Sequence, residues 1–146
     1  MLLRPDGSSF TTGRSHYTDR ASGSQEPSAK IFVKIGVAPL PGPIVAQLDT
    51  GASWSMLDAE VADAMDLLNG EGEQVPISTR LGRVVGRLER IHLDILADEG
   101  DSLRLEATVW VSSEWRSGSF LGYGGLLQHI RFVVDPSENA FHFGPT

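Results

Sequence analysis

The chain has 146 residues, with 12 Lys plus Arg against 19 Asp plus Glu, a formal net charge of −7, and no cysteine. This length suits one domain with a sizeable hydrophobic core. The negative charge opposes binding to nucleic acid or to an anionic membrane surface. The lack of cysteine excludes disulfides, thiolate metal sites and a thiol nucleophile.

Residues 1–28 are rich in Ser, Gly and Thr and carry few large apolar side chains. Such a segment buries too little surface to offset its ordering entropy, so we expect a flexible tail over 1–28 and a folded domain over 29–146. The tail could also be a boundary segment without a role, or a pro-segment that the protein itself removes near Pro27 to Ala29. Because the chain shows neither a secretory signal nor about 18 consecutive apolar residues, we expect a soluble, cytoplasmic protein.

A pattern of short β-strands begins at Lys30. The Pro- and Gly-rich residues 38–43 predict a hairpin between a first strand, with alternating apolar side chains, and the return strand Ile44–Leu48. The return strand is nearly all apolar, as expected of a strand that is buried on both faces. The alternating apolar positions of the first strand are Ile31, Val33, Ile35 and Val37.

Strand patterns also dominate the rest of the chain. Asp58 is a plausible N-cap for one short helix through Leu68, which the pair Asn69-Gly70 ends. Residues 126–130 are compatible with one or two helical turns. Strands are expected over 75–79, 88–96, 103–111, 131–134 and 140–143, with a glycine-containing hairpin over 80–87. The predicted fold class is therefore mainly β with one or two short helices.

The sequence Asp-Thr-Gly follows the apolar return strand at residues 49–51 and occurs only once. A carboxylate on a tight glycine turn suits acid–base chemistry on water, but that chemistry needs two carboxylates that share a proton. The segments Asp98-Glu99-Gly100 and Asp135-Pro136-Ser137 do not follow a buried strand into a comparable turn, so we interpret both as surface turns. The second carboxylate must then come from another chain. Alternatively, Asp49 is an ordinary turn aspartate that binds nearby amides.

Three features in this order resemble the retropepsin-like aspartic proteases: Leu48-Asp49-Thr50-Gly51-Ala52-Ser53, a later glycine-bearing hairpin, and Phe120-Leu121-Gly122. The resemblance covers about residues 29–145. It implies a retropepsin-like acid protease fold, a single lobe that resembles a closed β-barrel. It also implies an aspartic endopeptidase that acts as a symmetric homodimer on an extended polypeptide. Water between two Asp49 carboxylates would attack the peptide bond, without a metal or other cofactor.

The resemblance further implies roles for the residues around Asp49. Thr50 would hydrogen-bond to the turn of the partner, Gly51 would allow the two turns to approach, and Ser53 would orient the carboxylate. Retroviral relatives carry an ion pair at the positions of Ser53 and Tyr123, and both of its partners are missing here together. The residues implied in the site are Asp49, Thr50, Gly51, Ala52 and Ser53 in the turn, Gly82, Arg83, Val84, Val85 and Gly86 in a flap over the substrate, and Leu121 and Gly122 beneath the site.

Several alternatives remain open at this point. The hairpin could be a plain surface hairpin, and its arginines could be solvated rather than bind acidic substrates. The residues Trp54, Trp110 and Trp115 could line subsites or pack in the core. The four histidines show no metal-ligand spacing. The domain could also be a non-catalytic dimerisation or peptide-binding module with the same fold.

Overall fold

The computed structural model describes residues 1–20, 25, 26, 28, 30–80 and 82–146. Strands make up most of this part of the chain, which confirms the predicted fold class. The elements are β1 (Gly13–His16), β2 (Phe32–Val37), β3 (Ile44–Met56), α1 (Ala59–Ala64), β4 (Gln74–Thr79), β5 (Gly82–Ile95), β6 (Glu99–Gly100), β7 (Leu103–Val111), β8 (Ser119–Gly124), the 3₁₀ turn η1 (Leu127–His129), β9 (Ile130–Asp135) and β10 (Ala140–Pro145).

Four strands close into a small barrel. β3 pairs with β2 and β7, β7 pairs with β5, and β5 pairs back to β2. β4 extends the barrel as a partner of β5, and β8 lies beside β3. Because side chains alternate along a strand, every second residue points into the barrel. The inward side chains of Val33, Ile35, Leu93 and Val109 are at most 1% exposed, so the core fills the barrel.

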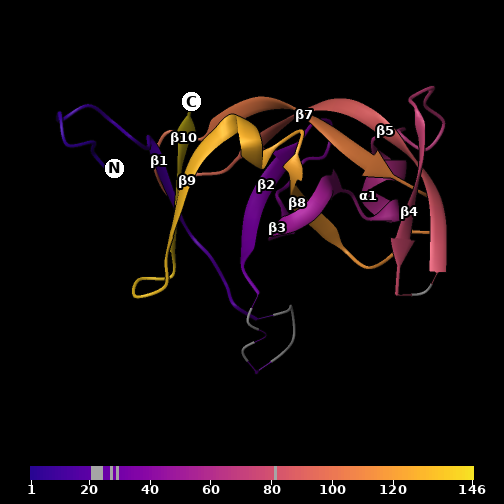
Figure 1. Ribbon diagram of the computed structural model, residues 1–146, viewed down its shortest axis with the longest axis horizontal. Helices are drawn as coiled ribbons and strands as arrows, with labels where there is room; N and C mark the ends of the chain where they lie inside the picture. Colours follow the sequence, from indigo (N-terminus) through magenta and orange to yellow (C-terminus); the bar gives the residue numbers. More distant parts are fainter. Residues whose placement is uncertain (21–24, 27, 29, 81) are drawn as a thin grey trace.

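A second sheet lies at the opposite end of the molecule from the β4–β5 hairpin (Figure 1). Its strand order is β6-β1-β10-β9, so β10 has a neighbour from its own chain on each side. The rings of Phe141 and Phe143 are fully buried and their centroids lie 5.5 Å apart. Both belong to the same apolar cluster as the barrel residues, which joins the second sheet to the barrel in one core.

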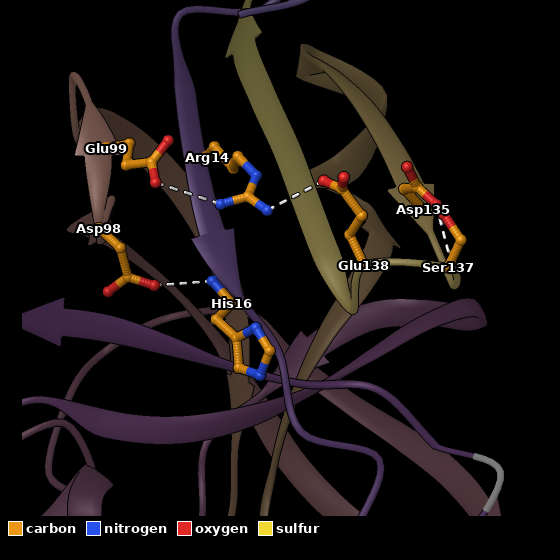
Figure 2. A network of polar contacts seen from close by, with 7 residues as sticks. All are labelled: Arg14, His16, Asp98, Glu99, Asp135, Ser137 and Glu138. Carbon is orange, nitrogen blue, oxygen red and sulfur yellow. Dashed lines mark hydrogen bonds and ion pairs between the residues drawn. The ribbon is translucent and has the colours of Figure 1, made fainter.

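The prediction of a flexible tail is wrong for residues 13–17. Gly13–His16 form β1, which pairs with β10 and β6, and the Tyr17 side chain is only 4% exposed. Arg14 adds ion pairs to Glu99 and Glu138 with N–O distances of 3.4 and 3.1 Å (Figure 2). Counting apolar side chains misses this strand because its order comes from backbone hydrogen bonds to distant strands and from one buried aromatic ring.

Residues 27 and 29, which frame the expected boundary between tail and domain and the suggested cleavage point, lie outside the described residues. Thr18 and Phe32 are nevertheless joined by two backbone hydrogen bonds of 3.1 and 2.8 Å. The described residues on the two sides of the boundary therefore contact each other directly.

Two strand predictions differ from the structure. The return strand is not buried on both faces, because the Val45 side chain is 58% exposed while Ala46 is fully buried. The hairpin turn is also shorter than expected, since Thr79 already pairs with Gly82. The left-handed φ of +114° at Gly82 allows the chain to reverse there, and the following residues continue as β5. Leu81, within the predicted hairpin, lies outside the described residues.

The start of the helix is predicted correctly and its end is not. Asp58 caps α1, because its side chain accepts a hydrogen bond of 3.0 Å from the Glu60 amide. The helix ends at Ala64, four residues before the expected end, and Asp66 adopts a left-handed φ of 57° that no helix can continue. A single 3₁₀ turn, η1, occupies the other helical segment. Among the described residues, no helix is long and apolar enough to cross a membrane.

Stability should rise with pH through the titration of His142. Burial lowers the pKa of this side chain below the ordinary value of 6.5, and the nearby positive charge of Arg14 acts in the same direction. The unfolded chain therefore binds more protons near pH 6, so stability is complete above pH 6.5 and falls as the pH is lowered towards the folded-state pKa. Urea unfolding between pH 5 and 8 should show this slope in the wild type.

Two variants test this pH dependence. His142→Gln removes the assigned side chain, and His92→Gln is the matched control, since the His92 side chain is exposed. The slope should be reduced in His142→Gln and retained in His92→Gln. An unchanged slope in His142→Gln would contradict the assignment.

Candidate active site

Asp49 lies where β3 bends back over β8. Leu48 and Asp49 pair with Leu121 and Gly122 in a parallel arrangement, and the register shifts directly after Asp49. Further along, Met56 pairs with Phe120, the residue that also pairs with Gln47. Two parts of β3 therefore lie against the same stretch of β8. Residues 50–53 form the bend between them, with Asp49 at its start.

The Asp49 carboxylate is held by the turn that follows it. The Gly51 amide donates a hydrogen bond of 3.0 Å to Oδ1 of Asp49. Asp49 is half-buried, whereas Thr50, Gly51 and Ser53 are exposed and Ala52 is half-buried. The carboxylate thus sits at the surface with a fixed orientation, beside a turn that is open to contact from outside the chain.

Gly122 supports the bend from below. A Cβ atom at this position would lie 2.3 Å from the Trp54 carbonyl oxygen and 2.7 Å from the Ser55 nitrogen. The Gly122 amide donates a buried hydrogen bond of 2.9 Å to Oγ of Ser55. The missing side chain therefore allows the backbone of β8 to touch the returning part of β3. Leu121, directly before it, is 1% exposed and packs in the core.

A cleft of about 580 Å³ opens above Asp49. One wall is the end of β4, and another comes from the loop before β8. We call this space the Asp49 cleft. It is lined by Lys30, Gln47, Asp49, Ala52, Met56, Ile77, Ser78, Thr79, Arg80, Trp115, Ser117 and Phe120. Asp49 is the one carboxylate among these residues, which all lie in the described part of the chain.

The residues expected to form a flap take different positions. Val84 pairs with Ile77, a residue of the cleft wall, and so shares its face of the hairpin. Val85 pairs with Pro76 on the other face of the hairpin, and its side chain is 55% exposed. It lines a separate hollow with Leu68 and Ser112 and does not line the Asp49 cleft. Gly82 and Arg83 are exposed at the start of β5.

Gly86 makes room for a neighbouring side chain and does not lie at the tip of the hairpin. A Cβ atom there would lie 2.2 Å from the Trp110 ring, so the absent side chain makes room for the indole. Trp110 is fully buried, and its Nε1 donates a hydrogen bond of 2.8 Å to the Val75 carbonyl oxygen. The indole thereby connects β7 to both strands of the hairpin and fixes its base.

Sequence reasoning missed the wall that β4 contributes. Ile77, Ser78 and Thr79 line the Asp49 cleft, whereas the predicted flap contains only residues after the turn, Gly82 to Gly86. The available signal was the alternation of Val75, Ile77 and Thr79, which predicts one inward face of β4.

The three tryptophans divide between the two roles left open. Trp110 is a core residue that also lines, with Trp54, a small adjoining cleft of about 250 Å³, while Trp115 lines the Asp49 cleft. Trp115 contacts Trp110 edge-on with centroids 6.1 Å apart, and it contacts Phe120 at 5.9 Å. Trp110, Trp115 and Phe120 thus form an aromatic row, which connects the base of the β4–β5 hairpin to the floor of the Asp49 cleft at Phe120.

Of the internal candidates for a second carboxylate, Asp98 directly precedes β6 and Asp135 ends β9, so both lie at the second sheet and not beside Asp49 (Figure 2). Asp98 accepts a hydrogen bond of 2.7 Å from the His16 amide. Asp135 accepts hydrogen bonds from the amide and hydroxyl of Ser137, which lower its pKa. Neither lines the Asp49 cleft. The described residues also contain no group of three His, Cys, Asp or Glu side chains that could hold a metal ion.

Replacing Gly122 by Ala should destabilise the protein by about 2 kcal/mol or more, because the methyl group must displace the backbone of β3. Chemical denaturation measures this loss. Gly42→Ala is the matched control, since no atom lies within 4 Å of a Cβ at Gly42. Equal stability of the two variants would contradict the close approach of β8 to β3.

Comparisons with known proteins support the fold. No protein-family model and no curated protein matches this chain. Among solved structures, it is similar to the crystal structure of a retropepsin-like aspartic protease from Rickettsia conorii, with a TM-score of 0.61 and 18% sequence identity. The match covers 89% of this chain and 98% of that one. The chain therefore has a retropepsin-like fold.

Proposed function

We propose that this chain is an aspartic endopeptidase that acts as a homodimer and hydrolyses an extended polypeptide. The observation that carries the proposal is a lone, oriented carboxylate, Asp49, in a cleft within a retropepsin-like fold. The cleft has a volume of about 580 Å³. Its position between the catalytic turn and β4 suits a strand-like substrate that extends the hairpin edge.

The chemistry requires a pair of carboxylates. Two such groups within hydrogen-bond distance cannot both ionise readily, so they share a proton and titrate as one unit. One would accept a proton from water while the other polarises the scissile carbonyl, and no covalent intermediate is formed. The second carboxylate is Asp49 of a second copy, since Asp98 and Asp135 are engaged in turns elsewhere.

The exposed bend is the surface on which two copies would meet. Thr50, Gly51 and Ser53 are exposed, and the exposed Tyr123 follows Gly122 on β8. Two-fold symmetry would bring each bend against its copy and each Asp49 against its counterpart. Contacts through the chain ends are more restricted, because β10 is already flanked by β1 and β9.

The β4–β5 hairpin would act as the flap. Its tip between Thr79 and Gly82 adjoins the Asp49 cleft through Thr79 and Arg80, while Trp110 holds its base. This arrangement suits a hairpin that bends above a fixed base when a peptide binds, excluding water from the reaction. Ile77 and Val84, on one face, would cover the substrate.

The alternative is a retropepsin-fold dimerisation or peptide-binding module without catalysis. Both functions use the same cleft, so binding alone does not separate them.

Asp49→Asn should lower the cleavage rate of unfolded protein by about three orders of magnitude or more, since the shared proton is lost. Mass spectrometry of the products at mildly acidic to neutral pH measures the rate. Asp63→Asn is the matched control because Asp63 is exposed on α1, away from the cleft lining. Peptide binding without cleavage by the wild type would favour the binding module.

Mixing copies tests the shared site. If one carboxylate comes from each chain, an equal, re-equilibrated mixture of wild type and Asp49→Asn should retain about a quarter of the activity of an all-wild-type sample with the same total number of chains. Activity proportional to the wild-type fraction, about one half, would contradict a dimeric site.

A further inference from the structure

Lys30 and Arg80 place positive charge at the mouth of the Asp49 cleft, although the chain carries a net charge of −7. Both are exposed, and neither has an ion-pair partner among the described residues. Arg90 and Arg104, by contrast, are paired with Glu106 and Asp94. The cleft therefore contains two cations that remain available to a bound molecule.

A second hollow of about 710 Å³ continues from this cleft. The two spaces share Gln47, Ser117 and Phe120, so one extended molecule can cross from one to the other. We call it the apolar hollow after Phe32, Val45 and Phe120, which line it beside polar residues that include Asp19, Arg20 and Asn139. The 58% exposure of Val45 leaves apolar surface that nothing in the described chain covers.

The spacing along β3 relates the hollow to the site of cleavage. Val45 precedes Asp49 by four residues on the same strand, which corresponds to about 13 Å of extended chain. A peptide that crosses Asp49 in an extended conformation would bring a side chain two to four positions from the scissile bond to this hollow.

We propose that the substrate is a peptide with an acidic side chain near the scissile bond and a bulky apolar side chain two to four positions away. Lys30 and Arg80 bind the acidic group, and the apolar hollow takes the second side chain. This substrate class rests on the proposed function. It explains how an acidic protein can select an acidic peptide, since charges at a cleft mouth act locally while distant charges are screened over about 8 to 10 Å.

The first test profiles cleavage in a library of proteome-derived peptides by mass spectrometry. We expect Asp and Glu to be enriched next to the cleaved bond and Phe, Leu or Trp two to four positions away. Matched peptides in which Asp or Glu is replaced by Asn or Gln should be cleaved about fivefold more slowly per acidic contact. The difference should shrink as salt rises.

Variants of the protein assign the preference to residues. Lys30→Glu and Arg80→Glu should each lower the ratio of the cleavage rate of acidic peptides to that of matched amide peptides, compared with the same ratio for the wild type. Lys34→Glu changes the net charge equally, but Lys34 lies outside both clefts and should retain the preference. Val45→Trp should fill the hollow and reduce cleavage of peptides with a bulky apolar residue. Leu3→Trp, at another exposed apolar position, should not.

The outcomes separate this inference from the proposed function. If the wild type cleaves peptides without acidic or apolar enrichment, the inference is overturned and the protease proposal stands. If no peptide is cleaved, the protease proposal fails. In that case, fluorescence anisotropy measures the affinity of the Asp49→Asn variant for labelled acidic and amide peptides, and so tests the Asp49 cleft and the apolar hollow without catalysis. Equal affinity for the two peptides overturns the inference.

Discussion

The close contact between β8 and the returning part of β3 is the constraint on which the site depends. Gly122 has no side chain, so its backbone reaches the Trp54 carbonyl and the Ser55 hydroxyl. β3 can therefore pair with β8 both before and after residues 50–53. Without this contact, β3 would have no support for the bend, and Asp49 would lose its fixed position at the start of it.

The same contact connects the bend at Asp49 to the rest of the molecule. Phe120, two residues before Gly122, touches the Trp115 ring, and Trp115 touches Trp110. Trp110 in turn holds β4 through the Val75 carbonyl and fills the space above Gly86. One aromatic row thus sets the distance between the cleft floor and the hairpin, because packed rings resist compression.

Local sequence signals predicted the parts of the structure that depend on near neighbours. The hairpin at 38–43 and the Asp58 cap follow from turn and capping chemistry within a few residues. Signals of this kind failed where distant segments decide the outcome. β1 lacks an apolar pattern, yet it is ordered between β6 and β10, and Gly86 looks like a flexible hairpin glycine, yet it receives the Trp110 ring.

The sequence by itself determined that a single Asp-Thr-Gly follows an apolar strand, and the hypothesis of acid–base chemistry completed by a second copy rests on this local pattern. It also determined the mainly β fold through strand periodicity. Only the tertiary structure decided which residues surround Asp49. Lys30, Ile77 and Trp115 are far apart in the sequence, and their meeting in one cleft depends on strand pairing and ring packing between distant segments.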